Sequence, residues 1–347
     1  AISNTRVIAD KVTEPAFNLD KKGYPIRDTS LIPGYDPPDG STPEQYLRKL
    51  TDEGLVRRYG TVTERERSRA DYELNVICSM GYAEYYLIVW DFINWSREQG
   101  IPVGPGRGSG VSSIVAYSIG ITDVEPLQYD LLFERFLNPD RVSMPDFDID
   151  FCTDRREETI EYVRNKYHPE NVCQIVTFGT MAAKNSIKDV GRVMNVPFSE
   201  TDRLTKIMDG KTSISDLLGL NIEKTKKKML AEQDEDKRAS IADKLNELQL
   251  ARNAEFCNLY ENDATLHSVI DMALKIEGMP RQTGMHAAGV VICRKKIADN
   301  VPLSRNGDDI TTQFVAKEIE ALGMLKMDFL ALVTLTDIKK CLDYIKE

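Results

Sequence analysis

The sequence predicts an α+β protein in which a mixed sheet with helices is interrupted by an all-helical insertion. Strand patterns occur in two blocks, within 143–178 and within 286–332, and the periodicity of the intervening 181–277 segment is almost entirely helical. Three further helical patterns come before the first block, over 43–60, 63–81 and 85–100. The simplest architecture with this order is one domain whose chain leaves the sheet, builds a helical unit and returns to the same sheet.

The segment before residue 43 contains no pattern of a long regular element. A short helical pattern covers 1–15, and the prolines that follow exclude a continuous helix because each removes a backbone donor: Pro15, Pro25, Pro33, Pro37, Pro38 and Pro43. Thr42 and Thr63 are then placed as N-caps of two amphipathic helices, and Gly100 ends the third. We therefore expect residues 1–40 to be the end of a preceding domain and a connector.

The remaining elements alternate between strands and helices. Residues 101–121 have the pattern of a short strand, a glycine-rich turn and a helix. Residues 143–151 alternate as a strand does, residues 153–167 are helical and residues 173–178 form a further strand pattern. After the insertion, strand patterns return over 286–296, 311–317 and 321–332.

Composition and charge narrow the class of protein. The chain has 347 residues, 41% hydrophobic and 29% charged, with a net charge of −10, which suits about two soluble globular domains. No stretch approaches the roughly 18 apolar residues of a bilayer-spanning helix and no signal peptide is recognisable, so we expect a cytoplasmic protein without a membrane partner. Six dispersed cysteines and three histidines disfavour disulfides and zinc. A catalytic metal should therefore be bound by oxygen.

The strongest chemical signal is the run of carboxylates in PDFDIDF. Strand geometry sends Asp146, Asp148 and Asp150 to one face and the apolar residues to the other. Neighbouring like charges are costly, and a divalent cation such as Mg²⁺ would neutralise them; without metal, at least one of Asp146, Asp148 and Asp328 should have a raised pKa. A solvated strand face, or an edge strand protected by charge, remains an alternative.

Two further motifs carry chemistry. The glycine loop GPGRGSG, residues 104–110, precedes a helix and offers backbone N–H groups, Arg107 and Ser109 to a phosphate, although a tight structural turn is the alternative. The strand pattern LKMDF places Lys326 and Asp328 on one face, where a lone aspartate is usually solvated. The three motifs together favour a metal-dependent phosphate site.

Five segments resemble the catalytic subunits of bacterial DNA polymerase III, the C-family replicative polymerases of the DnaE type. They are PVGPGRGSG, FERFLNPDRVSMPDFDIDF, QIVTFGTMAAKNSIKDVGRV, GMHAAGVVI and LGMLKMDFL, in the family's order. The resemblance implies a palm of the polymerase-β-like nucleotidyltransferase fold, interrupted by a helical thumb. It divides the chain into the end of a PHP domain and connector (1–40), palm (41–177), thumb (178–284), palm (285–333) and start of the fingers (334–347).

The resemblance also implies roles for individual residues. Asp146, Asp148 and Asp328 match the catalytic aspartates that bind two Mg²⁺ ions, for which Mn²⁺ can substitute. Asp150 is not one of these three, and we expect it to order the strand end or cap the following helix. The candidate phosphate ligands are Arg107, Gly108, Ser109, Arg135, Arg141 and Lys326, although basic residues there are also consistent with structural ion pairs. The candidate DNA contacts, spaced i, i+4 and i+8 on one helix, are Lys184, Lys188 and Arg192.

The implied activity is template-directed DNA synthesis, in which the primer 3′-hydroxyl attacks the α-phosphate of a deoxynucleoside triphosphate (dNTP). Primer–template DNA and dNTP are the implied partners, with a sliding clamp and other replicase subunits in the intact protein. Because the palm and thumb alone lack the fingers, we expect this chain to be poorly active or inactive. Two rival functions remain, a nucleotidyltransferase acting on a small molecule and a non-catalytic DNA-binding module.

Overall fold

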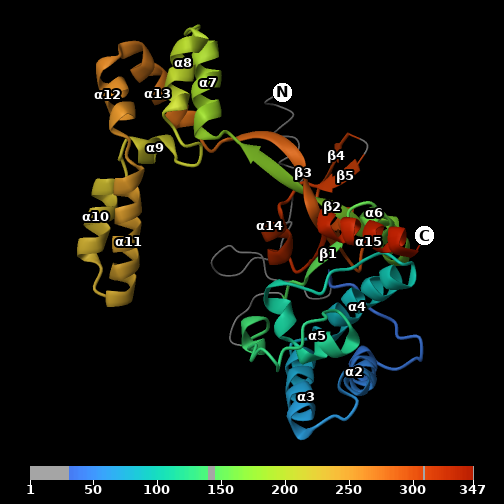
Figure 1. Ribbon diagram of the computed structural model, residues 1–347. Helices are drawn as coiled ribbons and strands as arrows, with labels where there is room; N and C mark the ends of the chain where they lie inside the picture. The colour runs from blue at the N-terminus through green and yellow to red at the C-terminus, as the bar shows by residue number, and fades with distance from the viewer. Residues whose placement is uncertain (1–30, 140–144, 308, 347) are drawn as a thin grey trace, which may run out of the picture. The chain divides into compact units, whose positions relative to one another are not determined.

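The computed structural model describes residues 31–139, 145–307 and 309–346. The expected helix within 1–15 and the candidate ligand Arg141 lie outside these ranges. The chain forms two compact units (Figure 1). One ends at Thr177 and resumes at Met285, and the other comprises Phe178–Gly284.

The first unit begins with the three predicted helices, α2 (Pro43–Tyr59), α3 (Glu64–Ser79) and α4 (Ala83–Glu98). Both predicted caps are confirmed. The Thr42 hydroxyl accepts from the N–H of Gln45, and the N–H of Thr63 donates to Glu66 Oε2 over 2.7 Å. Within the described ranges no single helix has the length and apolar character of a membrane span, whereas α3 and α4, which meet at a bend of 110°, reach these values only as a pair.

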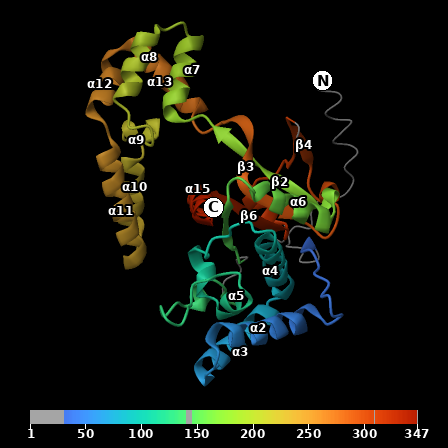
Figure 2. The same ribbon diagram turned by 45° about the vertical axis from the view of Figure 1, so that its right-hand side comes forward.

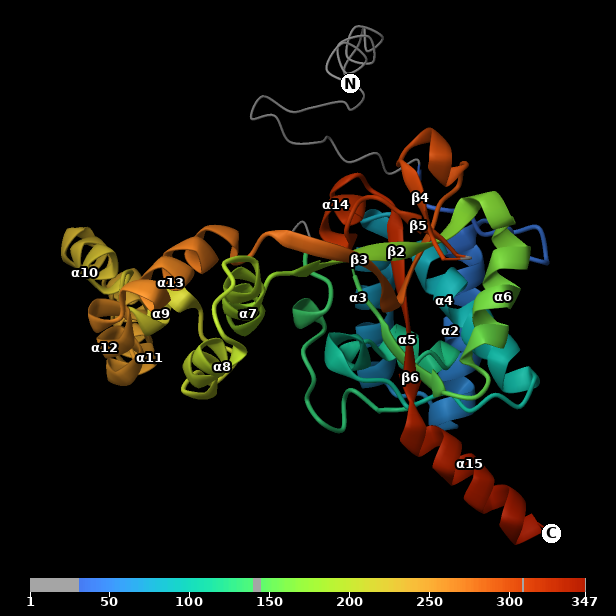
Figure 3. The same ribbon diagram turned by 90° about the horizontal axis from the view of Figure 1, so that it is seen from above.

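A six-stranded mixed sheet forms the centre of the first unit, in the order β1-β6-β3-β2-β5-β4 (Figures 1 and 3). β1 is parallel to β6, β3 is antiparallel to β6, β2 is parallel to β5 and β4 is antiparallel to β5. The strands are β1 (Asp148–Cys152), β2 (Val172–Thr180), β3 (Pro280–Ile292), β4 (Leu303–Asn306), β5 (Asp309–Thr312) and β6 (Leu325–Leu332). The predicted α+β class is confirmed.

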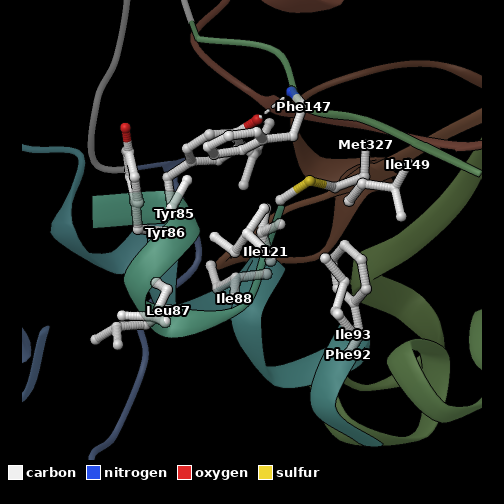
Figure 4. Close-up of a cluster of buried hydrophobic side chains, with 14 of the residues drawn as sticks. Tyr85, Tyr86, Leu87, Ile88, Phe92, Ile93, Ile121, Phe147, Ile149 and Met327 are labelled. Atoms are coloured by element: carbon white, nitrogen blue, oxygen red, sulfur yellow. Dashed lines mark hydrogen bonds between the residues drawn. The ribbon is translucent and has the colours of Figure 1, made fainter. Parts of the chain in front are cut away.

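Helices α4 and α6 (Arg156–Tyr167) lie beside the sheet (Figure 2). The main core joins side chains of these two helices with those of β1 and β6. Phe92 of α4 lies 4.9 Å from the ring of Phe329, and Tyr85 stacks on Phe147 at 5.6 Å. The Tyr85 hydroxyl also accepts from the N–H of Phe147 over 2.9 Å (Figure 4). This aromatic core therefore fixes the backbone at the start of β1.

Several strand predictions were wrong in extent, including the one over 286–296, where β3 begins at Pro280 and ends at Ile292. In the 143–151 segment, whose described part begins at Pro145, β1 begins at Asp148, so Asp146 lies in the loop before the strand. The predicted strand at 101–103 is reduced to one isolated bridge between Val103 and Phe151. The predicted 311–317 strand ends at Thr312 because Val315 begins α14 (Ala316–Ala321), where it is the N-cap.

The shorter elements of the first unit lie beside the sheet. The glycine loop continues into the 3₁₀ helix η2 (Gly108–Ser112), and Ser113 caps the six-residue helix α5 (Ile114–Ile119). The remaining elements are η3 (Phe133–Arg135), η4 (Pro169–Asn171), η5 (Ile297–Asp299) and α15 (Val333–Lys346).

The second unit is helical apart from the strand ends at its border, as predicted. Its core joins buried side chains that include Ile187, Phe256 and Ile270. α10 and α11 pair with each other, but α10 has no buried residue and α11 buries only Leu245 and Leu248 among those described. The helices are α7 (Ala183–Val193), α8 (Phe198–Lys206), α9 (Ile214–Leu217), α10 (Ile222–Ala231), α11 (Glu235–Ala251), α12 (Ala254–Asn262) and α13 (Ala264–Ile276).

Candidate active site

The central strands bring Asp148 and Asp328 side by side. In the parallel pair β1 and β6, Asp148 is in register with Asp328, and the next position pairs Ile149 with Phe329. Ile149 and Phe329 are buried, whereas the two aspartates face the more open side. The alternation predicted from the sequence is therefore confirmed for β1 and β6, and it places two carboxylates from distant segments on one face.

Lys326 lies between two of the predicted catalytic carboxylates. Its Nζ is 3.1 Å from Asp146 Oδ2 and 2.9 Å from Asp328 Oδ2, with Glu320 farther away at 3.8 Å. Burial favours the neutral amine, but bonds to Asp328 and Asp146 outweigh it and raise the pKa of Lys326 above its usual value. A cavity of about 110 Å³ adjoins this group and is lined by Pro145, Asp146, Glu320, Leu325 and Lys326.

The pKa of Asp146 is raised, as expected for one of these carboxyls, but burial contributes more to the shift than the neighbouring carboxylates do. Burial raises the pKa of the Asp146 carboxyl, and the charges of Asp328 and Asp148 raise it further, against the opposing effect of Lys326. Asp328 Oδ1 is buried and has no hydrogen-bond partner among the described residues. A buried oxygen without a partner is unusual in a folded protein and calls for an explanation such as a bound ion.

The donor set suits a hard divalent cation, but its present arrangement does not form a binding group. Oxygen ligands from carboxylates are those that Mg²⁺ prefers, and the buried Asp328 Oδ1 lacks a partner. However, no three His, Cys, Asp or Glu side chains within the described ranges are grouped to bind a metal ion. The ammonium of Lys326 lies between Asp146 and Asp328 and bridges them. A cation bound between these two carboxylates would have to displace it.

The glycine loop approaches the carboxylates closely enough to require glycine. A Cβ atom at Gly108, which has φ +67°, would lie 2.9 Å from Asp148 Oδ2. At Gly110 a Cβ atom would lie 2.5 Å from the Phe147 ring. The N–H of Gly104 donates to the Asp150 carbonyl over 2.8 Å. The loop is therefore fastened to β1 at several points.

Arg107 ties this loop to the carboxylates. Its Nε lies 3.2 Å from Asp150 Oδ2, and its Nη2 lies 3.8 Å from Asp148 Oδ1. The helix-capping role expected for Asp150 is wrong, because α6 has Arg155 at its N-cap without a side-chain cap bond. Asp150 instead pairs with Arg107 at the glycine loop.

The other predicted phosphate ligands line a neighbouring cavity. This cavity, of about 440 Å³, is bounded by the glycine loop on one side and by the 130–135 segment on the other. Gly108, Ser109 and Arg135 are among its lining residues, together with Val111, Ser112, Asp130, Leu131 and Leu132. Lys326 lies at the smaller cavity instead.

The predicted DNA-contacting residues all lie on α7 in the second unit, and acidic neighbours offset two of them. Lys188 Nζ is 3.5 Å from Asp202 Oδ1, and Arg192 Nη2 is 3.2 Å from Asp189 Oδ1. The Lys184 side chain runs beside Gly210. The basic strip is therefore present on one helix, with part of its charge neutralised.

Sequence reasoning missed an ion pair behind the glycine loop. Arg69 Nε lies 2.7 Å from Glu73 Oε1 within α3, and the Glu73 side chain is fully buried. The i, i+4 spacing of Arg69 and Glu73 could have indicated the pair. The sequence could not indicate that Glu73 is buried, because this burial depends on the packing of α3 against α5.

Comparison with known proteins shows the family of this chain. The family described as "Bacterial DNA polymerase III alpha NTPase domain" matches residues 45–331. The chain belongs to this family. It is 43% identical to DNA polymerase III subunit alpha of Aquifex aeolicus (strain VF5) over 353 aligned positions, which cover 100% of this chain and 29% of that protein.

Two other members of the family give similar values. DNA polymerase III subunit alpha of Treponema pallidum (strain Nichols) is 45% identical over 89% of this chain and 24% of its own length. The subunit of Escherichia coli (strain K12) is 43% identical over 91% of this chain and 26% of its own length. The chain thus spans between a quarter and a third of the Aquifex and E. coli relatives, and slightly less than a quarter of the Treponema one. The resemblance seen in its motifs is confirmed.

Proposed function

We propose that the chain is the palm and thumb of a replicative DNA polymerase that transfers a nucleotide from dNTP to a primer 3′-hydroxyl. Residues 41–177 and 285–333 would form the polymerase-β-like palm, 178–284 the thumb and 334–347 the start of the fingers. The observation that carries the proposal is the pairing of Asp148 with Asp328 on adjacent parallel strands, with the glycine loop against Asp148. Family membership supports it independently.

Asp146, Asp148 and Asp328 would hold the two Mg²⁺ ions, or Mn²⁺ in their place. Bound Mg²⁺ would supply Lewis-acid stabilisation of the attacking and leaving oxygens. In the absence of such ions, the ammonium of Lys326 bridges Asp146 and Asp328 and holds the two side chains close together. Once released from them, the same ammonium is available to a phosphate oxygen.

The glycine loop and its basic neighbours would hold the triphosphate. Gly108 and Ser109 present backbone at the cavity shared with Arg135, and Arg107 can exchange Asp150 for a phosphate because half of its side chain is exposed. A planar guanidinium binds phosphate with two donors, which fixes orientation as well as charge. Arg141, which lies outside the described residues, completes the proposed set.

The thumb would bind the primer–template duplex through its backbone. Lys184, Lys188 and Arg192 would contact phosphates, so binding would be independent of sequence and sensitive to salt. Template reading needs no base-specific protein contacts, because base pairing copies the sequence. In the intact protein a sliding clamp and other replicase subunits would be partners.

The test is metal-dependent nucleotide binding by the whole 347-residue chain. Calorimetric titration with dATP and Mn²⁺, with and without primer–template, should give binding that Asp146→Asn and Asp328→Asn each weaken by at least about tenfold. Asp154→Asn is the matched control, because Asp154 follows β1 but pairs with Lys340 over 3.1 Å at the surface. Primer extension by these 347 residues alone should be slow or absent, because small errors in placing the 3′-hydroxyl cost much of the rate.

Three results would contradict the proposal. Unchanged nucleotide binding by Asp146→Asn and by Asp328→Asn would contradict the proposed role of these carboxylates as metal ligands. Nucleotide binding without any affinity for primer–template would favour a small-molecule nucleotidyltransferase. Duplex binding without metal-dependent nucleotide binding would favour a non-catalytic DNA-binding module.

A further inference from the structure

A buried ion pair lies directly behind the glycine loop. Among the residues that the structure describes, Glu73 is the only charged residue that is buried, and none of its surface is exposed. Arg69, one turn earlier on α3, donates from Nε to Glu73 Oε1 over 2.7 Å. Burying a carboxylate costs desolvation free energy unless its oxygens accept hydrogen bonds. The hydrogen-bond partners of Glu73 therefore indicate its structural role.

The other oxygen of Glu73 fixes the segment that follows the glycine loop. Glu73 Oε2 accepts from the Ser113 hydroxyl over 2.8 Å and from the N–H of Val115 over 3.2 Å. Ser113 Oγ in turn accepts from the N–H of Ala116, which caps α5. The 3₁₀ helix η2, which follows the glycine loop, ends at Ser112. The Glu73 carboxylate therefore fixes the backbone directly after η2, where the chain enters α5.

Arg69 connects this segment to a second one. Its Nη2 donates to the Ser112 carbonyl over 3.3 Å and to the Leu131 carbonyl over 3.1 Å. Ser112 and Leu131 belong to the two separate chain segments that line the 440 Å³ cavity, as do Ser109 and Arg135. The guanidinium of Arg69 therefore bridges these two segments, and the carboxylate of Glu73 holds the guanidinium in place.

We propose that Arg69 and Glu73 are positioning residues, which set the spacing between the glycine loop and the 130–135 segment and thereby the affinity for the nucleotide's phosphates. Neither residue lines the cavity, so neither is catalytic. The inference rests on the proposed function, because it assumes that this cavity takes the phosphates of dNTP. A guanidinium suits the task because its rigid fork reaches several acceptors at fixed angles, which an ammonium cannot do.

The two residues allow the bridge to be separated from the ion pair. Arg69→Lys keeps a cation beside Glu73 but removes the planar donors that reach Ser112 and Leu131. Glu73→Gln keeps the shape and one acceptor but weakens the support of Arg69 and Ser113. Asp71→Asn is the matched control, because Asp71 lies on the same helix and its partner Arg48, 2.9 Å away, is at the surface.

The first measurement is hydrogen exchange of the ligand-free chain. In Arg69→Lys, exchange of the amides of Ser113, Leu131 and Arg135 should rise by about tenfold, the loss expected when charged hydrogen bonds that hold both segments are removed. Amides of α6 should be unchanged, and Asp71→Asn should match the parent. Unchanged exchange of these three amides in Arg69→Lys would overturn the inference, even if Glu73→Gln fails to fold.

The second measurement is the dissociation constant of dATP with Mn²⁺. Arg69→Lys should weaken binding by about tenfold while its melting temperature stays within a few degrees of the parent's, because the ion pair is kept. If the parent binds and Arg69→Lys binds equally well, the positioning role is wrong and the proposed function stands. If the parent chain binds no nucleotide at all, the proposed function fails for this chain, and the positioning role fails with it.

Discussion

Replacing Lys326 by methionine tests the balance of charge at the centre of the site. The change removes the ammonium that lies 3.1 Å from Asp146 and 2.9 Å from Asp328 and leaves the carboxylates facing one another. Removing one partner of a buried ion pair costs about 3–5 kcal/mol. Asp328 is only 11% exposed, but Asp146 is 44% exposed and partly hydrated. We therefore expect the lower end, a loss of about 3 kcal/mol in the free energy of unfolding.

Divalent cations should reverse much of this loss. In Lys326→Met no ammonium has to be displaced, so Mg²⁺ should bind the variant more tightly than the parent. At a concentration a hundred times its dissociation constant, a ligand stabilises the folded state by about 2.7 kcal/mol. The parent should gain less at the same concentration, because its Lys326 already neutralises the carboxylates.

Urea unfolding followed by circular dichroism, with and without Mg²⁺, measures both effects. Lys340→Met is the control, since Lys340 pairs with Asp154 at the surface and such pairs contribute about 0–1 kcal/mol. The reasoning would be refuted if Lys326→Met lost no more stability than Lys340→Met. It would also be refuted if Mg²⁺ stabilised the parent and Lys326→Met equally.

Three further predictions concern the loop, the carboxylates and the thumb. Gly110→Ala should lose about 1–3 kcal/mol of unfolding free energy, because the added Cβ would lie 2.5 Å from the Phe147 ring. Adding Phe147→Leu should restore part of the lost stability. An unchanged melting temperature in Gly110→Ala alone would contradict the predicted clash. The folded-state pKa of Asp146 is raised, chiefly by burial, so the unfolding free energy of the parent relative to Asp146→Asn should fall as pH rises above about 4; a rise over the same range would show the opposite shift. Alanine at Lys184, Lys188 and Arg192 of α7 should weaken duplex binding for every DNA sequence. The slope of log binding constant against log salt concentration should become shallower by about 0.9 per lost phosphate contact. A loss of binding confined to one DNA sequence would contradict recognition of the DNA backbone.

Local patterns in the sequence predicted the elements well, and the reason is visible in β6. Strict alternation separates Lys326 and Asp328 from the buried Met327 and Phe329, and this pattern needs no knowledge of the partner strands. Helix ends were equally local, because Thr42 bonds to Gln45 within one turn. Predictions of this kind use only neighbours in the chain.

What the sequence alone did not contain was the pairing of distant segments. The register between Asp148 and Asp328 joins positions far apart in the chain, and only tertiary packing decides it. The resemblance to a family supplied the grouping of these residues, but not the bridging position of Lys326. The partner of Asp150 was missed for the same reason, because the return of the glycine loop to β1 brings Arg107 beside it.

The charges of the site explain why metal and nucleotide should bind together under the proposed function. Among the described residues, Asp146, Asp148, Asp150 and Asp328 pair with two basic side chains, Arg107 and Lys326, and Glu320 also lies 3.8 Å from Lys326, so the carboxylates outnumber their cationic partners in this part of the chain. A triphosphate adds further negative charge, and like charges this close repel strongly in a partly buried site. Nucleotide binding therefore requires added positive charge at the carboxylates, and that charge in turn frees Arg107 and Lys326 for the phosphates. The same two side chains would thus keep the carboxylates in place before binding and hold the phosphates afterwards.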